Sequence, residues 1–514
     1  MAGNKFTSSS QPQNSIKLNG GLNSTAGPFG VDDSESTDLQ NIDFNKFGSI
    51  LKRSGSTALN TTAISPSPTI DSLHWYEAVV SGSQVRYAVI TAGTKLYKMD
   101  SLDGAWDDVT GNVILTAGNH ADTENWLNEC YFVNGVDVPV KWTGTGNGTT
   151  VPQPANVTKA KFIKQFNNYM FIANMTVSGT VQSSRIYWSD LKSTTAWTGT
   201  SFIDIAKDDG QIITGLRVLS DRLVVFKERS IYNVFFTGDV DLPFILPGGG
   251  KSNSAVGCIA PYSIQEVENG LVFLSFDGFY YYDGNNSYKI SDKINTTLLS
   301  YNTTRFNQAV ACKQISKNRY FCALPGPSST TNNKIIVWDW FNNGFSIYSG
   351  LAPAALSTFY VSGIDERPYF GDYSGFVYRM DTGSDDYPLN VQTAINAYFY
   401  ANWKQFGDIV DQKGIPNIVI YYQNSNSILT FAYSYDFETT DHYTTTINLA
   451  TSTAVYGTAI YGTDVYANAG GAGIRQDLDG RGRVIRYKFA NSTLGETFQI
   501  DGIGSNVHLE TVSG

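Results

Sequence analysis

The residue types that most often carry out catalysis are sparse in this chain and do not group. No two of its four histidines have metal-ligand spacing. The four cysteines are far apart and form no CxxC pair, which favours buried thiols over disulfides or a zinc site. The histidines are His74, His120, His442 and His508, and the cysteines are Cys130, Cys258, Cys312 and Cys322. No HExxH, GxSxG, Walker A or GxGxxG motif occurs in a suitable context. We therefore assign no catalytic, cofactor-binding or metal-binding residue.

Sugar hydrolysis is the enzymatic function that the polar residues bring closest. Residues 100–106, DSLDGAW, resemble the Asp box of sialidases, but lack one spacer before Gly104 and another before Trp106. The motif does not recur, so we interpret Asp103 as a turn residue. Sialidases also need clustered arginines for the substrate carboxylate, and nothing in the sequence groups the candidates. These arginines are Arg185, Arg217, Arg222 and Arg229. The sequence locates no pair of catalytic carboxylates and leaves their existence open.

Two further segments have local charge or glycine patterns that invite a binding role. Residues 246–254, LPGGGKSNS, lack Walker spacing and any following helical pattern, which favours a flexible loop over a nucleotide site. Residues 474–489, IRQDLDGRGRVIRYKF, form a basic patch with interleaved aspartates, which is typical of a solvated or intersubunit hairpin. The net charge of −10 argues against a nucleic-acid grip by the bulk field of the protein.

The elements that must position these residues are strands. In VFLSFDGFYYYDG, residues 272–284, Asp277-Gly278 between apolar runs predicts a hairpin with a type I′ turn. Apolar residues fill nearly every position, which indicates strands covered on both faces. Similar hairpins recur every 40–50 residues or so, the period of propeller blades. Their turns are expected near Gly93, Gly135, Ser183, Arg229, Gly278, Gly344 and Gly375.

We therefore predict an all-β chain with a β-propeller of six or seven blades; a string of β-sandwich domains is the competing architecture. Residues 1–60 are polar and weakly patterned, which indicates an extended N-terminal arm. Residues 61–389 hold the repeats. Residues 390–514 alternate more clearly and are expected to form a separate β-sandwich or barrel. No apolar run approaches the roughly 18 residues of a membrane span, and no signal peptide is expected.

Several stretches, taken in order, resemble one family. NIDFNKFGSILKRSG near the start is similar to the opening of hub, or nozzle, proteins in the tails of short-tailed bacteriophages, some of which are known as packaged-DNA stabilisation proteins. DDGQIITGL, LVVFKERSIYNVFF and LDGRGRVIRYKF continue the resemblance over most of residues 35–505. The matching positions are Asn41, Asp43, Gly48, Lys52, Arg53, Asp209, Gly210, Phe226, Lys227, Arg229, Gly257, Asp277, Gly278, Gly480, Arg481, Arg483, Phe498 and Asp501.

The resemblance implies a structural, non-enzymatic virion protein of the phage tail, assembled in the host cytoplasm. It implies a homohexameric ring that retains packaged DNA and conducts it during ejection. Expected partners are tail adaptor or connector proteins, tail fibres or spikes, a plug or needle, and double-stranded DNA in passage. Basic walls would bind phosphates and slow that passage, so we expect Lys227 and Arg229 to lie away from an open lumen. The alternative is a propeller glycosidase or receptor-binding tail protein that acts on host surface glycans.

Overall fold

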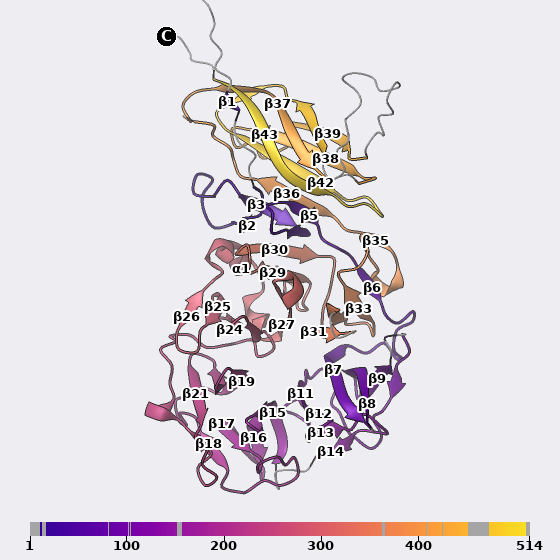
Figure 1. The fold of residues 1–514 in the computed structure, drawn as a ribbon, viewed down its shortest axis with the longest axis vertical. Helices are drawn as coiled ribbons and strands as arrows, with labels where there is room; N and C mark the ends of the chain where they lie inside the picture. The colour runs from indigo at the N-terminus through magenta and orange to yellow at the C-terminus, as the bar shows by residue number, and fades with distance from the viewer. Residues whose placement is uncertain are drawn as a thin grey trace, which may run out of the picture.

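Seven four-stranded antiparallel sheets form a β-propeller in the computed structural model, which describes residues 11–12, 17–80, 82–100, 102, 104–151, 157–361, 365–407, 409–423, 425–450 and 472–509. The sheets follow one another around a common centre, and their first strands lie side by side there (Figure 1). The predicted all-β propeller is therefore confirmed. Of the six or seven blades that the repeat spacing allows, the described residues form seven.

The first six blades each use four consecutive strands, ordered from the centre outward. Blade one is β7 (Ile70–Val80), β8 (Ser83–Ala92), β9 (Lys95–Asp100) and β10 (Asp107–Asp108). Blade two is β11 (Asp122–Trp126), β12 (Glu129–Val133), β13 (Val140–Trp142) and β14 (Thr149–Thr150). Blade three is β15 (Val157–Phe166), β16 (Tyr169–Val177), β17 (Thr180–Trp188) and β18 (Phe202–Asp204).

The same pattern continues through the next three blades. Blade four is β19 (Ile213–Leu219), β20 (Arg222–Lys227), β21 (Ile231–Phe236) and β22 (Phe244–Ile245). Blade five is β23 (Gln265–Val267), β24 (Gly270–Ser275), β25 (Gly278–Tyr282) and β26 (Ser287–Lys289). Blade six is β27 (Val310–Gln314), β28 (Arg319–Leu324), β29 (Lys334–Asp339) and β30 (Gly344–Ser349). Short helical turns connect blades and strands, namely η1 (Pro247–Gly249), η2 (Asp292–Ile294), α1 (Asn295–Ser300), η3 (Thr303–Gln308) and η4 (Ile315–Lys317).

Blade seven closes the ring with a strand from the other end of the chain. It is built from β31 (Ala355–Tyr360), β32 (Glu366–Gly371), β33 (Val377–Met380) and β6 (Ser56–Ala58). The fourth strand, β6, precedes blade one in the sequence, so the propeller cannot close until residues far apart in the chain have met.

Two larger sheets enclose a second core beside the propeller. The seven-stranded sheet holds β4 (Ile42–Phe44), β5 (Ile50–Lys52), β43 (Gln499–Leu509), β37 (Lys413–Tyr422), β40 (Ala472–Asp477), β1 (Gln11–Pro12) and β41 (Arg481–Gly482). The six-stranded sheet holds β2 (Gly21–Leu22), β3 (Glu35–Gln40), β36 (Ala397–Ala401), β42 (Ile485–Asn491), β38 (Ile428–Tyr435) and β39 (Tyr443–Asn448). A small link, β34 (Asp385–Asp386), η5 (Pro388–Asn390) and β35 (Thr393–Ala394), joins this sandwich to the propeller.

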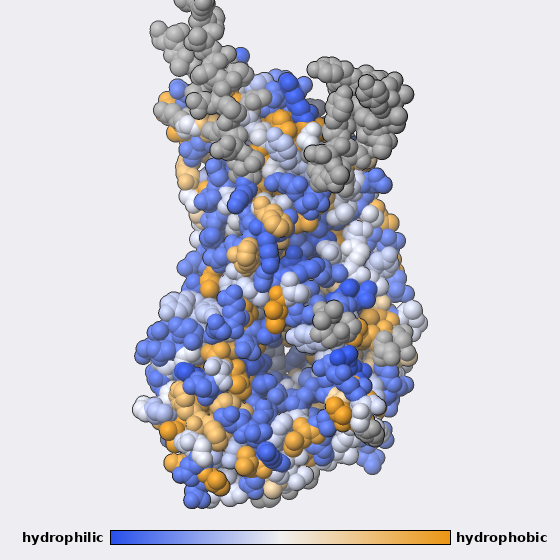
Figure 2. Space-filling view, viewed as in Figure 1, coloured by the Kyte–Doolittle hydropathy of each residue, from blue (hydrophilic) through white to orange (hydrophobic). Residues whose placement is uncertain are grey.

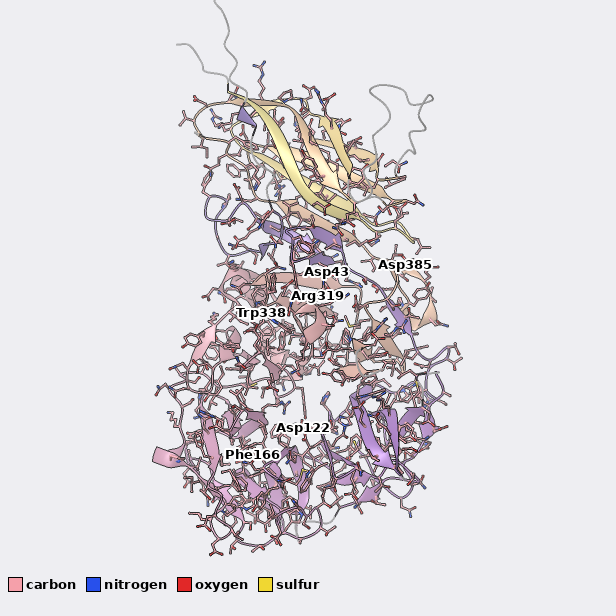
Figure 3. All side chains as sticks on the ribbon, in the orientation of Figure 1. Asp43, Asp122, Phe166, Arg319, Trp338 and Asp385 are labelled. Carbon is pink, nitrogen blue, oxygen red and sulfur yellow. The ribbon has the colours of Figure 1, made fainter. Side chains whose placement is uncertain are left out.

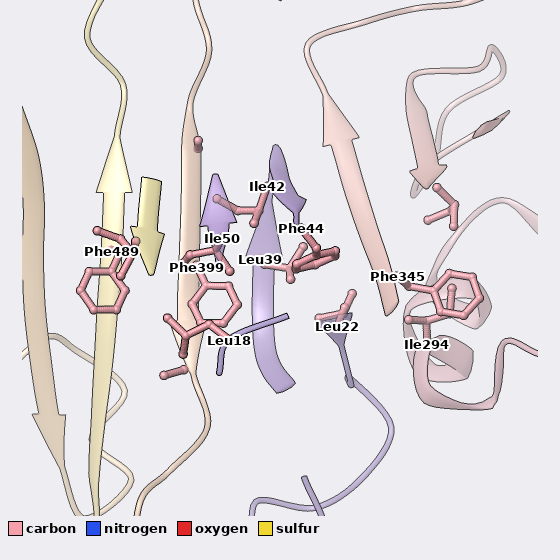
Figure 4. Packing of buried hydrophobic residues seen from close by; sticks show 14 of the residues in the cluster. Leu18, Leu22, Leu39, Ile42, Phe44, Ile50, Ile294, Phe345, Phe399 and Phe489 are labelled. Carbon is pink, nitrogen blue, oxygen red and sulfur yellow. The ribbon is translucent and has the colours of Figure 1, made fainter. Parts of the chain in front are cut away.

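Residues 17–58 lie between the two bodies. Within the segment expected to be an extended arm, β2 to β5 belong to the sandwich sheets and β6 belongs to the propeller. Figure 4 shows Leu39, Ile42 and Phe44 with Phe399 of the sandwich on one side and Phe345 of blade six on the other. One continuous apolar cluster therefore runs from the propeller through these strands into the sandwich.

The hairpin of residues 272–284 forms, but its turn differs from the predicted one. Ser275 pairs with Gly278, so Phe276 and Asp277 are the central turn residues, and neither has positive φ. Gly278 begins β25 with φ of +142°. A Cβ atom there would lie 2.3 Å from the Ser291 hydroxyl oxygen, so the space at this position requires glycine.

Replacing Gly278 with valine should lower the free energy of unfolding by about 2 kcal/mol or more, because an added side chain meets a buried serine. Thermal and denaturant unfolding measure this. Gly27→Val is the matched control, since nothing lies within 4 Å of a Cβ at Gly27. Equal stability of the Gly278 variant and the wild type would contradict this role.

Candidate functional site

The segment between β5 and β6 crosses from the sandwich to the propeller through a buried ion pair. The guanidinium of Arg53 donates to both carboxylate oxygens of Asp386, at 2.5 and 3.0 Å, and both side chains are buried. Its Nε donates to Asn41 Oδ1 at 2.8 Å, and the hydroxyl of Ser56 donates to Asp386 at 2.9 Å. Since β34 supplies Asp386, this pair fixes the crossing segment to the link between the two bodies.

A second buried carboxylate fixes the nearby strand β4 to blade six. Asp43 on β4 lies 2.9 Å from Nη1 of Arg319 on β28 and accepts a hydrogen bond from the hydroxyl of Tyr348 on β30. Burial alone would lower the pKa of Arg319, but the carboxylate of Asp43 raises it above its ordinary value. Figure 3 shows Asp43 and Arg319 next to each other at this boundary. The carboxylate therefore compensates a cation that the strands of blade six bury.

Lys52, which directly precedes Arg53, fixes the start of the crossing segment to the sandwich. The ammonium of Lys52 donates to Asn491 Oδ1 and to the carbonyl oxygen of Glu496, each at 2.8 Å. Burial lowers the pKa of Lys52. Asp385 accepts from the backbone N–H of Gly495 at 2.9 and 3.0 Å, so the sandwich loop is also tied to the link. We call Asp43, Lys52, Arg53, Arg319 and Asp386 the joint.

The other positions that carry the family resemblance lie in turns and cores. Lys227 is fully buried and donates to Asp209 at 2.9 Å. A Cβ at Gly257 would lie 2.1 Å from the carbonyl oxygen of Lys227, so the backbone packs closely there. Asp501 accepts from the hydroxyl of Ser49 at 2.8 Å. Phe226 and Phe498 are core residues, Gly48, Gly210 and Gly480 have positive φ, Asp277 pairs with Lys289, and Arg481 and Arg483 lie at β41.

The centre of the propeller holds a polar channel. Two adjoining cavities of about 480 and 220 Å3 share six of their lining residues and run along the first strands of the blades. Polar residues line most of it, and the molecular surface is hollowed near the propeller centre (Figure 2). The charged and imidazole side chains that line the channel are His74, Glu77, His120, Asp122, Lys164, Arg217 and Lys313.

Internal partners engage most of these groups. Lys164 pairs with Glu124 at 2.5 Å, and Asp122 lies 3.7 Å from Nη1 of Arg217 and accepts from the Ile163 N–H at 3.0 Å. Burial raises the pKa of Asp122. Among the described residues, no group of three or more histidine, cysteine or carboxylate side chains could hold a metal ion. Contacts within the protein therefore hold most of the charged side chains of the channel in place.

Both ring nitrogens of His74 have hydrogen-bond partners within the protein. Its Nε2 donates to Asn125 Oδ1 at 2.8 Å, and its Nδ1 accepts from the hydroxyl of Thr123 at 2.7 Å. The amide of Asn125 is oriented by donating to the Trp75 carbonyl oxygen at 2.9 Å. Burial lowers the pKa of His74 to about 4 and that of His120 to about 3. Both imidazoles are therefore neutral near pH 7.

Of the four arginines considered for a sialidase site, Arg185, Arg217 and Arg222 have separate partners, and Arg229 lies at another cavity. Arg185 pairs with Asp204 and lies over Phe202, Arg222 pairs with Asp221, and Arg217 alone lines the channel. Asp103 of the partial Asp box lies outside the described residues. The four cysteines are free and buried, as the sequence predicts. The sequence patterns do not reveal the charged and imidazole side chains that line the channel, because these come from separate blades. Their only signal in the sequence is the position of each residue within its repeat.

The glycine-rich and basic segments have ordinary local structure. Residues 246–254 contain η1, and the Gly250 N–H donates to the Pro247 carbonyl oxygen at 2.9 Å. In the basic patch, Arg475 and Asp477 form an exposed pair at 3.0 Å on β40. No helix among the described residues is long and apolar enough to cross a membrane.

No family model matches the chain, and no curated protein matches it. Similar solved structures include YCF48 bound to D1 peptide, at 11% identity and a TM-score of 0.39, covering 67% of this chain and 98% of that one. The computationally designed Ika8 protein has 12% identity and a TM-score of 0.34, covering 71% and 99%. PorZ of the type-IX secretion system of Porphyromonas gingivalis has 11% identity and a TM-score of 0.36, covering 71% and 44%.

Breaking the joint should destabilise the protein strongly. Asp386→Asn leaves the buried Arg53 without a full counter-charge, so we expect a loss of about 3–5 kcal/mol in the free energy of unfolding. Denaturant unfolding measures it. Asp477→Asn breaks the exposed pair with Arg475 and should cost no more than about 1 kcal/mol. Similar small losses in both variants would contradict the importance of burial here.

The pKa of His74 also predicts a pH dependence. Its folded-state pKa of about 4 lies below the ordinary 6.5, so the unfolded chain takes up a proton first as the pH falls. The contribution of His74 to stability is complete above about pH 6.5 and is lost as the pH falls toward 4. Asp71, whose pKa burial raises to about 6, acts in the opposite sense, so the comparison must be between variants.

In His74→Gln, proton uptake on unfolding near pH 5 should decrease by about one proton relative to wild type. The slope of unfolding free energy against pH gives this number. An unchanged slope would mean that His74 is not held neutral in the folded protein.

Proposed function

We propose that this chain is a structural virion protein, the ring-forming tail nozzle of a short-tailed bacteriophage, which retains packaged DNA and conducts it during ejection. In this proposal the working form is a homohexamer in the virion tail, assembled in the host cytoplasm. Its neighbours would be adaptor or connector proteins, tail fibres or spikes, and a plug or needle. The protein would carry out no catalysis.

The joint is the observation that carries this proposal. The resemblance to tail hub proteins rests at its N-terminal end on Asn41, Asp43, Lys52 and Arg53. These are the residues whose buried contacts connect propeller and sandwich. A component that holds DNA under packaging pressure needs parts that do not move against one another. Buried, fully bonded ion pairs give such a fixed geometry, since separating them leaves uncompensated charges.

Charge placement agrees with the conducting role. The chain carries a net charge of −10, and an acidic surface does not retain DNA phosphates. The buried, paired state of Lys227 removes one cation that six copies would otherwise multiply. Arg229 remains exposed.

The nozzle proposal predicts that the purified chain forms rings with an axial opening wide enough for B-DNA, about 20 Å. Negative-stain imaging of the protein and of virions containing it provides the test. Discrete monomers that cleave host-surface glycans would contradict the proposal and favour the glycan-acting alternative. Rings without glycan cleavage are the expected result.

A further inference from the structure

A cavity of about 570 Å3 adjoins the propeller channel, and its volume is within the size range of pockets that bury ligands. Tyr262 lines both this cavity and the channel. The turn between β20 and β21 supplies Glu228 and Arg229, and the turn between β24 and β25 supplies Phe276. We call this cavity the turn pocket. Its other lining residues are Lys161, Ile212, Thr214, Ile259, Pro261 and Asn307.

The turn pocket holds two cations without anionic partners. Neither the Lys161 ammonium nor the Arg229 guanidinium forms an ion pair within the described ranges, although the chain has more acidic than basic residues. Burial lowers the pKa of Lys161, and no carboxylate opposes that effect. Among the described residues that line the pocket, Glu228 is the one acidic side chain, so the charged groups sum to a positive value.

The uncharged residues of the turn pocket include exposed apolar side chains and an unpaired hydroxyl among the described residues. Phe276 is 58% exposed and Ile212 is 39% exposed, which is unusual for such large apolar side chains gathered around one cavity. The hydroxyl of Thr214 is buried and has no hydrogen-bond partner among the residues that the structure describes. A ligand for this pocket should therefore combine carboxylates, apolar side chains and a backbone or side-chain polar group.

The same chain carries a segment of that chemistry. The loop between β21 and β22 contains Asp239-Val240-Asp241-Leu242, which we call the acidic loop. Val240 is 81% exposed and Leu242 is 57% exposed. Within the described residues, neither aspartate forms an ion pair. The Asp239 N–H donates to Thr237 Oγ1 at 3.0 Å, and the Asp241 N–H donates to Asp239 Oδ1 at 2.9 Å.

One copy cannot bring the two surfaces together. The turn pocket includes the turn that enters β21, and the acidic loop follows the end of β21. The strand has six residues, so the two surfaces lie at its opposite ends, about 20 Å apart. Contact between them requires two molecules and is heterologous, the kind of contact that repeats into a closed ring when its rotation allows.

We propose that the acidic loop of one copy docks in the turn pocket of the next, with Asp239 and Asp241 facing Lys161 and Arg229 and with Val240 and Leu242 against Ile212 and Phe276. This contact rests on the proposed nozzle ring and names the surfaces that would build it. It also gives the exposed Arg229 a partner carboxylate, away from DNA.

Charge reversal tests the docking. The pocket variant Lys161→Glu with Arg229→Glu, and the loop variant Asp239→Lys with Asp241→Lys, should each lower the association constant about tenfold or more. Combining all four changes should restore association, because the charges are again complementary. Light scattering and native mass spectrometry measure assembly, and circular dichroism confirms that each variant is folded.

Lys17→Glu with Lys46→Glu is the matched control, since both lysines are exposed and lie outside the two surfaces. It should assemble like wild type. Rings that persist in both reversed variants would overturn the docking while leaving the nozzle proposal standing. A wild type that stays monomeric at every concentration would overturn both. Reversed variants that lose assembly without rescue in the fourfold variant would overturn the docking alone.

Discussion

The contact between Arg53 and Asp386 is the constraint on which the rest of the structure depends. Taking two charges out of water is costly, and the cost is recovered only when the geometry satisfies both groups. Here Asn41 and Ser56 complete the bonding. Arg53 comes from the crossing segment, Ser56 begins β6, Asp386 comes from the link, and Asn41 lies between β3 and β4. The pair therefore holds only when β5 is in the sandwich and β6 is in blade seven. It couples closure of the propeller to attachment of the sandwich.

This coupling gives the molecule its mechanical character. A propeller closed by its own last strand can rotate on a linker, whereas this one is closed by β6, which begins three residues after Arg53. The apolar cluster around Leu39 and Phe44 adds a continuous hydrophobic contact between propeller and sandwich to the ion pair of Arg53 with Asp386. Ion pairs such as that of Lys164 with Glu124 hold the side chains of the channel in place. The outward-facing turns of the propeller are then the surfaces at which we expect partners to bind.

Local sequence patterns predict the blades, but they do not predict contacts between residues that are far apart in the sequence. The Asp277-Gly278 hairpin forms, although its turn is shifted by one residue. The backbone of Gly278 packs closely against the hydroxyl of Ser291, and no local sequence pattern reveals that contact. Ser183 was expected in a turn but lies within β17, and the strands actually turn at Ser178 and Gly179. Gly344 joins the third and fourth strands of blade six, whereas the other turns join second and third strands, which explains the irregular spacing there.

Hydrogen exchange measured by mass spectrometry tests the coupling most directly. If the joint unites the two bodies, then amides of β5 in the sandwich and of β6 and β33 in the propeller should open as one cooperative unit with the same free energy. Asp386→Asn should lower that free energy equally in both places, while Asp477→Asn leaves it unchanged. Opening of the sandwich strands at lower free energy than blade seven, with the Asp386 variant affecting only one of them, would show that the bodies are independent and would contradict the coupling.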